Sequence, residues 1–427
     1  VMRQTFTTIV GKSVRKIAQL RGGGSALPGL FAEKIDPDFI SRTLADLPHG
    51  VVLVSGTNGK TTTTKMVVEL LEGQGLRVFT NRTGSNFTRG VAAALLGDID
   101  IHGKLDADIA VLELDEAYAV HFVRAVAPSY CLLLNVMRDQ LDRFGEIDST
   151  AKLLHTIARG TTKGIVINRD DPRLNTSALL DSVDAPVHSY SVAPSLRKLF
   201  PSDDSLRDAS AKKQSTELRT DDTMLASIDG QHAVFHYDKH NHPVSLQLKG
   251  IYNIQNAAGA VAIVRMILGA ALDNKRMLAS LSNVTPAFGR GETVTVSGAP
   301  CEIVLVKNPS GFRLGLKSFP PEGSATMIAI NDQYADGRDM SWLWDVEFDS
   351  LRDTHVDMVS GIRAYDMALR LQYDEVEMSV VEPDIATALR QFVDSHAGEP
   401  LRIYCTYTAM LNIRKELAKL TTVEVIR

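Results

Sequence analysis

The stretch VVLVSGTNGKTTTTKMV, residues 51–67, decides the fold expected for this chain. Its first four residues are apolar and mostly β-branched, which predicts a short buried strand over Val51–Val54. A glycine-rich turn follows at Gly56–Gly59, and the pattern from Thr63 to Leu71 predicts a helix that ends near Gly73. A strand, a glycine turn and a helix in this order are typical of a phosphate-binding loop, because backbone N–H groups at the helix N-terminus point at the phosphates.

The residue types in this turn suit ATP and a magnesium ion. Lys60 supplies a positive charge for the β and γ phosphate oxygens, and the Thr61 hydroxyl can complete a Mg²⁺ shell. The spacing GxxGKT is shorter than the common GxxxxGK[ST], and a purely structural glycine turn is the alternative. The residues predicted to bind the nucleotide here are Gly56, Thr57, Asn58, Gly59, Lys60, Thr61 and Thr62.

Strand-like and helix-like stretches alternate on the C-terminal side of this loop. Buried strands are predicted at 77–80, 109–114, 130–134 and 164–167, with helices such as 88–96 and 150–158 between them. Such alternation predicts an α/β fold with a mainly parallel sheet that helices cover on both faces. Residues 195–245 break the rhythm and predict a small antiparallel insert with a mobile lead-in. A helix rich in small residues is predicted at 254–268.

The alternation resumes after residue 292, with strands predicted at 303–306, 325–330, 355–359 and 401–405. We therefore expect three parts: an N-terminal helical segment (1–48), a central ATP-binding domain (49–293) and a smaller C-terminal α/β domain (294–427). The length of 427 residues agrees with two or three domains.

Composition excludes several classes of function. The net charge of −5 gives no indication of nucleic-acid binding. Three cysteines, Cys131, Cys301 and Cys405, lie in separate apolar runs and are expected to be buried thiols in strands. No CxxC pair and no membrane-spanning run is evident, so we expect a cytoplasmic protein without a disulfide framework or structural zinc.

The first 20 residues predict a basic amphipathic helix. Two interpretations remain open for it. The helix packs on the body of the protein with a solvated basic face, or it is attracted to anionic lipid at the inner face of the membrane.

The phosphate loop closely resembles the ATP site of the Mur ligase family, and further segments follow in the family's order. These are VLELDE (111–116), LLLNVMRDQLDRFGEID (132–148), INRDDP (167–172), KGIYNIQNAAGA (249–260) and FGRGE (288–292). The resemblance covers roughly residues 50–295 and implies a central Mur ligase domain that binds ATP and Mg²⁺.

The resemblance also implies roles for single residues. Glu113 matches the family's Mg²⁺-binding glutamate, and Arg290 matches an arginine that faces the phosphates. Asn168, Asp171, Asn253 and Asn256 fall in segments that contact the nucleotide.

Structural alternatives stand beside each role. Glu113 could be a surface carboxylate and Arg290 a hinge between two glycines. Asn168 and Asp171 could form a turn, and the other two asparagines could cap a helix. Asp115 and Glu116 could be exposed loop residues.

Two departures from the family concern metals. Gln140 stands where members that add amino acids carry histidine, and Lys152 is out of register with their carbamylated lysine, which leaves a second metal site open. The central insert has no cysteine, so we predict no zinc ribbon.

The segments INDQYADGRDMSWLWD (330–345), SGIRAYDMALRL (360–371) and YTAML (407–411) resemble the C-terminal domain of the Mur ligases that amidate lipid II. The resemblance implies a heterodimer with a GatD-type glutaminase that supplies ammonia. It also implies the D-isoglutamate α-carboxylate of lipid II as the substrate. Asp339 matches the aspartate lent to the partner's Cys–His pair. On chemistry alone, Asp332, Asp336, Asp339 and Asp345 could also form a metal site or be solvated loop charges.

The expected function is therefore an ATP-dependent carbon–nitrogen ligase in peptidoglycan synthesis, with Lys60, Glu113, Arg290 and Asp339 as its catalytic residues. Only about 50 residues precede Val51, too few for a UDP-binding α/β domain, so a UDP-linked substrate is not expected. The alternatives are a stand-alone Mur-type amino-acid ligase, a P-loop ATPase that performs no ligation, and a catalytically dead binding subunit.

Overall fold

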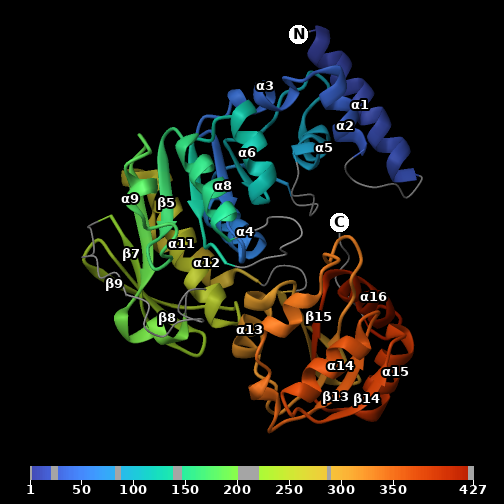
Figure 1. Ribbon diagram of the computed structural model, residues 1–427. Coiled ribbons are helices and arrows are strands. Elements are labelled where there is room, and N and C mark those ends of the chain that lie inside the picture. The colour runs from blue at the N-terminus through green and yellow to red at the C-terminus, as the bar shows by residue number, and fades with distance from the viewer. Residues whose placement is uncertain are drawn as a thin grey trace. The chain divides into compact units, whose positions relative to one another are not determined.

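A computed structural model of the chain describes residues 2–20, 27–81, 88–137, 147–200, 221–285 and 290–421. The chain divides into two compact units (Figure 1). The first comprises residues 1–136, 148–248 and 253–285, and the second comprises 137–147, 249–252 and 286–427. The lead-in expected to be mobile falls largely on residues 201–220, outside the described residues.

The first unit is built on a nine-stranded sheet with the order β2-β3-β1-β4-β5-β6-β7-β8-β9. Its strands are β1 (Val51–Ser55), β2 (Val78–Thr80), β3 (Ile109–Glu113), β4 (Tyr130–Leu133), β5 (Gly164–Asn168), β6 (Val187–Val192), β7 (Thr223–Asp229), β8 (His232–Tyr237) and β9 (His240–Ser245). Pairing is parallel from β2 through β7. Every residue of β1, β3 and β5 is buried, as expected for strands covered on both faces.

The antiparallel segment predicted within 195–245 is present as β7, β8 and β9. It does not stand apart from the main sheet, because β7 pairs in parallel with β6 and so continues it. The connecting strand β6, with the sequence VHSYSV, was not predicted. Its serine and histidine residues interrupt the apolar run that would indicate a buried strand, although its last four residues are buried.

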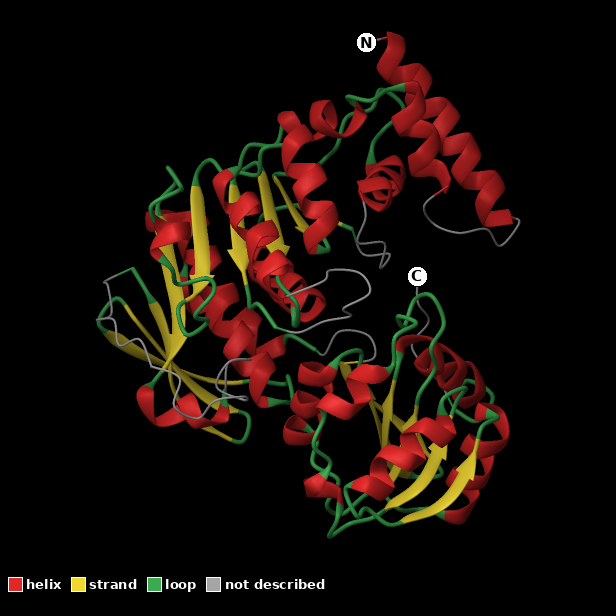
Figure 2. Ribbon diagram, viewed as in Figure 1, coloured by secondary structure: helices red, strands yellow, loops and turns green. Residues whose placement is uncertain are grey.

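The first unit also contains helices, several of which cover its sheet (Figure 2). They are α1 (Met2–Leu20), α2 (Leu27–Ile35), α3 (Phe39–Ala45), α4 (Lys60–Gly73), α5 (Thr88–Asp98), α6 (Glu116–Ala125), α8 (Ile147–Arg159), α9 (Ser177–Leu180), α11 (Ile251–Leu268) and α12 (Asn274–Asn283). Helices α1 and α2 pack on α5. Residues 251–271, which include α11, are long and apolar enough to cross a membrane, but 67% of this apolar stretch is buried within the protein. This stretch is therefore accounted for as a core helix.

The second unit contains a six-stranded sheet with the order β10-β11-β15-β12-β13-β14. Its strands are β10 (Arg290–Val296), β11 (Ala299–Leu305), β12 (Ala325–Ala329), β13 (Val356–Ser360), β14 (Met378–Glu382) and β15 (Leu401–Cys405). Only the β10–β11 hairpin is antiparallel. Its helices are α13 (Pro309–Ser318), α14 (Ala364–Tyr373), α15 (Ile385–Ser395) and α16 (Tyr407–Leu417). Two apolar clusters pack against this sheet.

The α/β class and the mainly parallel sheets predicted from the sequence are confirmed. The three cysteines are buried thiols, as predicted, in β4, β11 and β15. Burial raises the pKa of Cys131 and Cys301 to about 12, so neither is a ready nucleophile.

Candidate functional site

The phosphate loop joins β1 to α4, and its backbone needs two glycines. Gly56 and Gly59 have φ angles of 136° and 88°, which residues with a Cβ atom rarely adopt. Gly59 is also the N-cap of α4, so the helix begins at Lys60 rather than at the predicted Thr63. The first N–H groups of a helix have no acceptor within it, which suits this turn to an anion.

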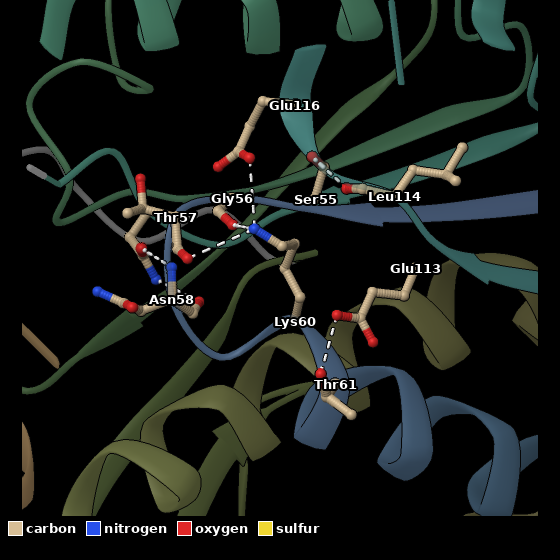
Figure 3. A network of polar contacts seen from close by, with 10 residues as sticks. Ser55, Gly56, Thr57, Asn58, Lys60, Thr61, Glu113, Leu114 and Glu116 are labelled. Carbon is tan, nitrogen blue, oxygen red and sulfur yellow. Dashed lines mark hydrogen bonds and ion pairs between the residues drawn. The ribbon is translucent and has the colours of Figure 1, made fainter. Parts of the chain in front are cut away.

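Lys60 is buried beneath the loop (Figure 3). Its Nζ donates hydrogen bonds to the carbonyl oxygens of Gly56 at 2.6 Å and Thr57 at 3.4 Å. It also forms an ion pair with Glu116, 3.3 Å from Oε2. Glu116 is the first residue of α6 and is almost fully buried, so its interpretation as an exposed loop residue is wrong.

Thr61 and Glu113 meet because β1 and β3 are neighbours in the sheet. Thr61 Oγ1 donates to Glu113 Oε1 at 2.8 Å. Asn81 holds the backbone of Glu113 from the other side: its Nδ2 donates to the Glu113 carbonyl at 2.8 Å, and its Oδ1 accepts from the Glu113 N–H at 3.0 Å. A hydroxyl and a carboxylate side by side at a phosphate loop are ligands that Mg²⁺ accepts.

Asn135, at the end of β4, holds the opposite side of the loop. Its Oδ1 accepts from the Asn58 N–H at 2.9 Å, and its Nδ2 donates to the Asn58 carbonyl at 3.0 Å. The Asn135 carbonyl accepts from the Thr57 N–H at 3.0 Å. Neither Asn135 nor Asn81 was predicted as a site residue. For Asn135 a signal existed, since it follows a buried apolar run and opens a segment that resembles the family.

Asn168 and Asp171 shape the turn after β5. Asp171 accepts backbone N–H groups from Val136 at 2.7 Å, Arg173 at 2.9 Å and Leu174 at 3.3 Å. Asn168 Oδ1 accepts from the Asp170 N–H at 3.0 Å. Burial raises the pKa of Asp171 to about 6. These contacts are those of turn-forming residues, the structural alternative given for this pair.

Asn253 and Asn256 lie within α11, which begins at Ile251, so the interpretation of either as its N-cap is wrong. Asn256 is buried and lies against Gly59, where a Cβ atom would collide with its Nδ2. The absence of a side chain at Gly59 therefore makes room for α11 beside the phosphate loop. Asn253 is half-buried in the first turn.

Two predicted positions cannot be placed as side chains. Arg290 begins β10 in the second unit, and its side chain lies outside the described part of the chain. Gln140, on which a second metal site depends, belongs to residues 138–146, which are likewise not described.

Asp339 lies in the second unit, on the loop that follows β12. Its Oδ1 accepts from the Ser341 N–H at 2.9 Å, and hydrogen bonds from Ser341 lower the pKa of Asp339 below its ordinary value. Nearby, the buried Asp336 accepts the Thr408 N–H at 2.7 Å and the Gln333 N–H at 3.1 Å. The loop is thereby tied to the start of α16.

The four aspartates of this segment do not converge. Asp332 lies 3.6 Å from Arg363 and Asp345 accepts through its backbone from Arg313, while Asp336 is buried. Over the ranges that the structure describes, no group of three or more His, Cys, Asp or Glu residues could hold a metal ion. The structure therefore gives no support to the metal-site interpretation of this cluster.

Comparison with known proteins finds two matching families. Residues 54–264 match the Mur ligase middle domain, and residues 305–410 match the MurT ligase C-terminal domain. Together they account for most of both units.

Two curated relatives match over nearly their whole length. Both are named lipid II isoglutaminyl synthase (glutamine-hydrolyzing) subunit MurT. The protein from Streptococcus pneumoniae is 28% identical, with 98% of this chain and 97% of the relative covered. The protein from Staphylococcus aureus (strain COL) is also 28% identical, with 92% and 93% covered.

A solved structure agrees on the fold. The MurF ligase from Thermotoga maritima in complex with ADP has a TM-score of 0.64 at 17% identity, covering 90% of this chain and 84% of that one. At that identity the likeness concerns the fold alone.

Proposed function

The chain belongs to the Mur ligase family, and we propose that it is the ligase subunit of a lipid II isoglutaminyl synthase. In this role it activates the D-isoglutamate α-carboxylate of lipid II and amidates it to D-isoglutamine with ammonia from a glutaminase subunit. The observation that carries the proposal is the joining, in one chain, of a phosphate loop to a C-terminal MurT-type unit along nearly the full length of the MurT relatives. We assign the nucleotide chemistry to residues 49–293 and the partner-facing role to residues 294–427.

Amide formation requires a carboxylate with a better leaving group than hydroxide. ATP supplies that group as its γ-phosphoryl, and ammonia then displaces phosphate from the acyl carbon. The protein's part is positioning and charge neutralisation. We propose that the Lys60 ammonium and the Arg290 guanidinium offset phosphate charge, and that the loop backbone from Gly56 to Thr62 holds the phosphates.

The arrangement of Thr61 and Glu113 fits a magnesium ion, since their oxygens already lie 2.8 Å apart on neighbouring elements. We propose that these two residues hold Mg²⁺ together with the nucleotide, which lowers the charge repulsion that an attacking oxygen meets. Asn168, Asp171, Asn253 and Asn256 remain proposed nucleotide contacts. For Asp171 the observed bonds favour support of the turn rather than direct contact.

The nitrogen source is proposed to be a partner subunit of the GatD type. All three cysteines of the chain are buried in strands, so none is placed as a glutaminase nucleophile. Asp339 is a half-buried carboxylate whose pKa is lowered, as a group that orients a histidine and stabilises imidazolium should be. We propose that it completes the partner's Cys–His pair.

Large exposed side chains on the loop that carries Asp339, and on two segments bonded to that loop, support a docking role for this part of the second unit. Tyr334, on the same loop, is 87% exposed, and Ile362, Tyr365 and Tyr407 are exposed on the segments that follow β13 and β15. Asn331 links all three segments, since it bonds Thr406, Thr408 and Ile362. Exposed aromatic side chains on a rigid support are typical of protein interfaces.

The test is amide formation by the assembled pair. The chain is co-purified with the glutaminase and supplied with ATP, glutamine and lipid II, and the product is analysed by mass spectrometry. We expect the amide of lipid II only when all three substrates are present. ATP turnover without an amide product would instead favour a stand-alone Mur-type amino-acid ligase, which would need no partner and would join an amino acid to its substrate.

A further inference from the structure

The N-terminal helix α1 packs on the first unit with its small and polar side chains. Thr7 and Thr8 are fully buried, and Gly11 packs so closely on α5 that a Cβ atom there would come within 2.5 Å of Leu96. Lys12 Nζ donates to the Ile99 carbonyl at 2.7 Å. The face that a helix usually makes apolar for packing is here made of threonine and glycine.

The large apolar side chains of α1 face away from the protein. Phe6, Ile9 and Ile17 are 60%, 54% and 52% exposed. Their spacing places them on one face of a helix, with the exposed Ser13 between Ile9 and Ile17. We call this set the α1 stripe. A helix whose outer face meets only water usually buries such large apolar residues and exposes its polar ones, and α1 does the opposite.

The neighbouring helix α2 repeats the inversion. Leu27 and Phe31 are exposed and lie four residues apart, hence on one face, and the exposed Lys34 follows on the same face. Its buried side consists of Pro28, Gly29 and Ala32. Two adjacent helices therefore each expose their bulkiest apolar residues, which marks an interaction surface rather than scattered exposure.

The charge on α1 selects the kind of surface that it fits. Residues 2–20 contain Arg3, Lys12, Arg15 and Lys16 and no acidic residue, although the whole chain has a net charge of −5. Lys16 is exposed beside Ile17, whereas Lys12 bonds Ile99 and the Arg15 guanidinium lies against Gly97 of α5. A helix with bulky apolar residues on its outer face and only cationic charges complements a layer of anionic headgroups over acyl chains.

We propose that α1 and α2 dock this protein on an anionic phospholipid bilayer, with the α1 stripe, Leu27 and Phe31 inserted at the boundary between headgroups and acyl chains. The inference rests on the proposed function in one respect. A substrate held in the membrane by its lipid requires a ligase that works at the membrane surface.

Vesicle binding by the full chain tests this, with vesicles that contain neither lipid II nor any other substrate. We expect flotation with vesicles of phosphatidylglycerol mixed with phosphatidylcholine, weakened by added salt, and little flotation with phosphatidylcholine alone. The triple variant Phe6→Ser, Ile9→Ser, Ile17→Ser should lose at least about tenfold in binding. Lys16→Arg should bind like wild type, and Lys16→Gln should lose about fivefold, since one cationic side chain near such a surface contributes about that factor.

Leu199→Ser is the matched control, because Leu199 is an exposed apolar residue of the first unit outside α1 and α2. It should bind vesicles like wild type. All the variants replace exposed side chains, so their melting temperatures should equal that of wild type. Absence of vesicle binding, or equal binding by the triple variant, would overturn the proposal. A change in oligomeric state in the triple variant with vesicle binding intact would assign the surface to a second copy instead. None of these readouts depends on amidation, so a failed amide assay would not alter them.

Discussion

At the scale of single residues, the ion pair of Lys60 with Glu116 sets the electrostatics of the phosphate loop. Both side chains are buried, at 6% and 1% exposure, and the ammonium also bonds the loop carbonyl of Gly56. A buried charge that loses its partner is costly, by about 3–5 kcal/mol for well-buried pairs. The carboxylate of Glu116 therefore stabilises the loop, and it pairs with the same Lys60 ammonium that we propose offsets phosphate charge.

We predict that Glu116→Gln lowers the free energy of unfolding by about 2–4 kcal/mol, because the buried Lys60 ammonium then faces a neutral amide. Bound nucleotide should restore much of this loss, since phosphate offers the missing negative charge. The rise in melting temperature caused by Mg·ATP should thus be larger in the variant than in wild type, as measured by thermal unfolding with and without nucleotide.

Glu69→Gln is the control for this variant. Glu69 forms an i,i+4 pair with Lys65 on the same helix α4, at 3.7 Å and with both side chains about one-third exposed. Exposed pairs of this kind contribute about 0.3–0.5 kcal/mol. Equal destabilisation by the two substitutions would show that the buried Lys60–Glu116 pair contributes no more to the free energy of unfolding than an exposed pair does.

Local spacing identified the loop residues, whereas Glu113 was identified only through the family resemblance, and Asn81 and Asn135 were missed. Gly56, Gly59, Lys60 and Thr61 are recognisable because their spacing alone defines a phosphate loop. Asn81 and Asn135 contact Glu113 and Asn58 across separations of 32 and 77 residues. No local pattern encodes such a pairing, since it depends on which strands become neighbours.

At the scale of elements, the turn after β5 is held by one carboxylate. Asp171 bonds the backbone at Val136, beyond the end of β4, and at Arg173 and Leu174 in its own turn. It thus joins the ends of two neighbouring strands. Burial removes this carboxylate from water, which raises its pKa, while the three N–H bonds lower it. The effect of burial is larger, so the pKa of Asp171 rises to about 6.

This shift has a definite sign for stability. A carboxyl whose pKa is higher in the folded state binds more protons there than in the unfolded chain between about pH 4 and pH 6, so the free energy of unfolding falls as pH rises through that range. The loss due to Asp171 is on the order of 2–3 kcal/mol at neutral pH. We predict that Asp171→Asn is less stable than wild type, because its amide has one oxygen and cannot accept from both Val136 and Arg173. It should also have a flatter pH dependence, as measured by urea unfolding at about pH 4.5 and about pH 7.

Asp184→Asn serves as the control for loss of one carboxylate, since Asp184 is exposed on the segment before β6. A variant at Asp171 that lost as much stability between the two pH values as wild type does would contradict the assigned cause.

Strands with a continuous apolar pattern were predicted well. Elements whose limits depend on backbone conformation or on pairing with other strands were not. The strands β1, β3, β4 and β5 form continuous buried runs and match their predicted positions within one or two residues. The start of α4 was placed three residues late, because Gly59 acts as its N-cap through a left-handed backbone rather than a side-chain signal. The hairpin strand β10 and the edge strand β14 were not predicted.

At the scale of the whole molecule, the proposed chemistry is divided between the two units. The phosphate loop belongs to the first and Asp339 to the second. A substitution in the first unit should therefore abolish activation of the carboxylate, and a substitution in the second should abolish only the supply of ammonia from glutamine. In a single combined active site, one substitution would impair both.

We predict that Asp339→Asn in the assembled pair lowers glutamine-dependent amidation by on the order of 10²–10⁴-fold, because the partner's histidine loses its orienting charge. Free ammonium should restore amide formation to this variant. Lys60→Ala should be inactive with either nitrogen source, because activation of the carboxylate fails. Amide formation and glutamate release are measured in parallel.

Asp332→Asn is the control, since it removes a carboxylate from the same loop as Asp339. It should retain most of the glutaminase activity. Unchanged glutamine turnover in Asp339→Asn, or failure of ammonium to rescue it, would remove Asp339 from its assigned role.

The alternation of strands and helices in the sequence predicted the α/β fold with mainly parallel sheets. It did not predict that the first sheet has nine strands. The antiparallel segment was expected to be a small insert in the central domain, and in the structure it lengthens the main sheet through β6 and β7. The α1 helix was expected from its basic amphipathic pattern, but the pattern did not predict which face of the helix packs on the protein. In the structure the packed face is the one that carries Thr7, Thr8 and Gly11.

The contact of Gly59 with Asn256 also has a consequence for the order of events during translation. The two residues are about 200 positions apart in the chain, and the site is complete only when α11 lies beside the loop. At ribosomal speeds of 5–20 residues per second, roughly 10–40 s separate the synthesis of the loop from that of its last neighbour. A nascent chain that already carries the whole GTNGKT stretch therefore has no finished nucleotide site until all nine strands of the first sheet have been made.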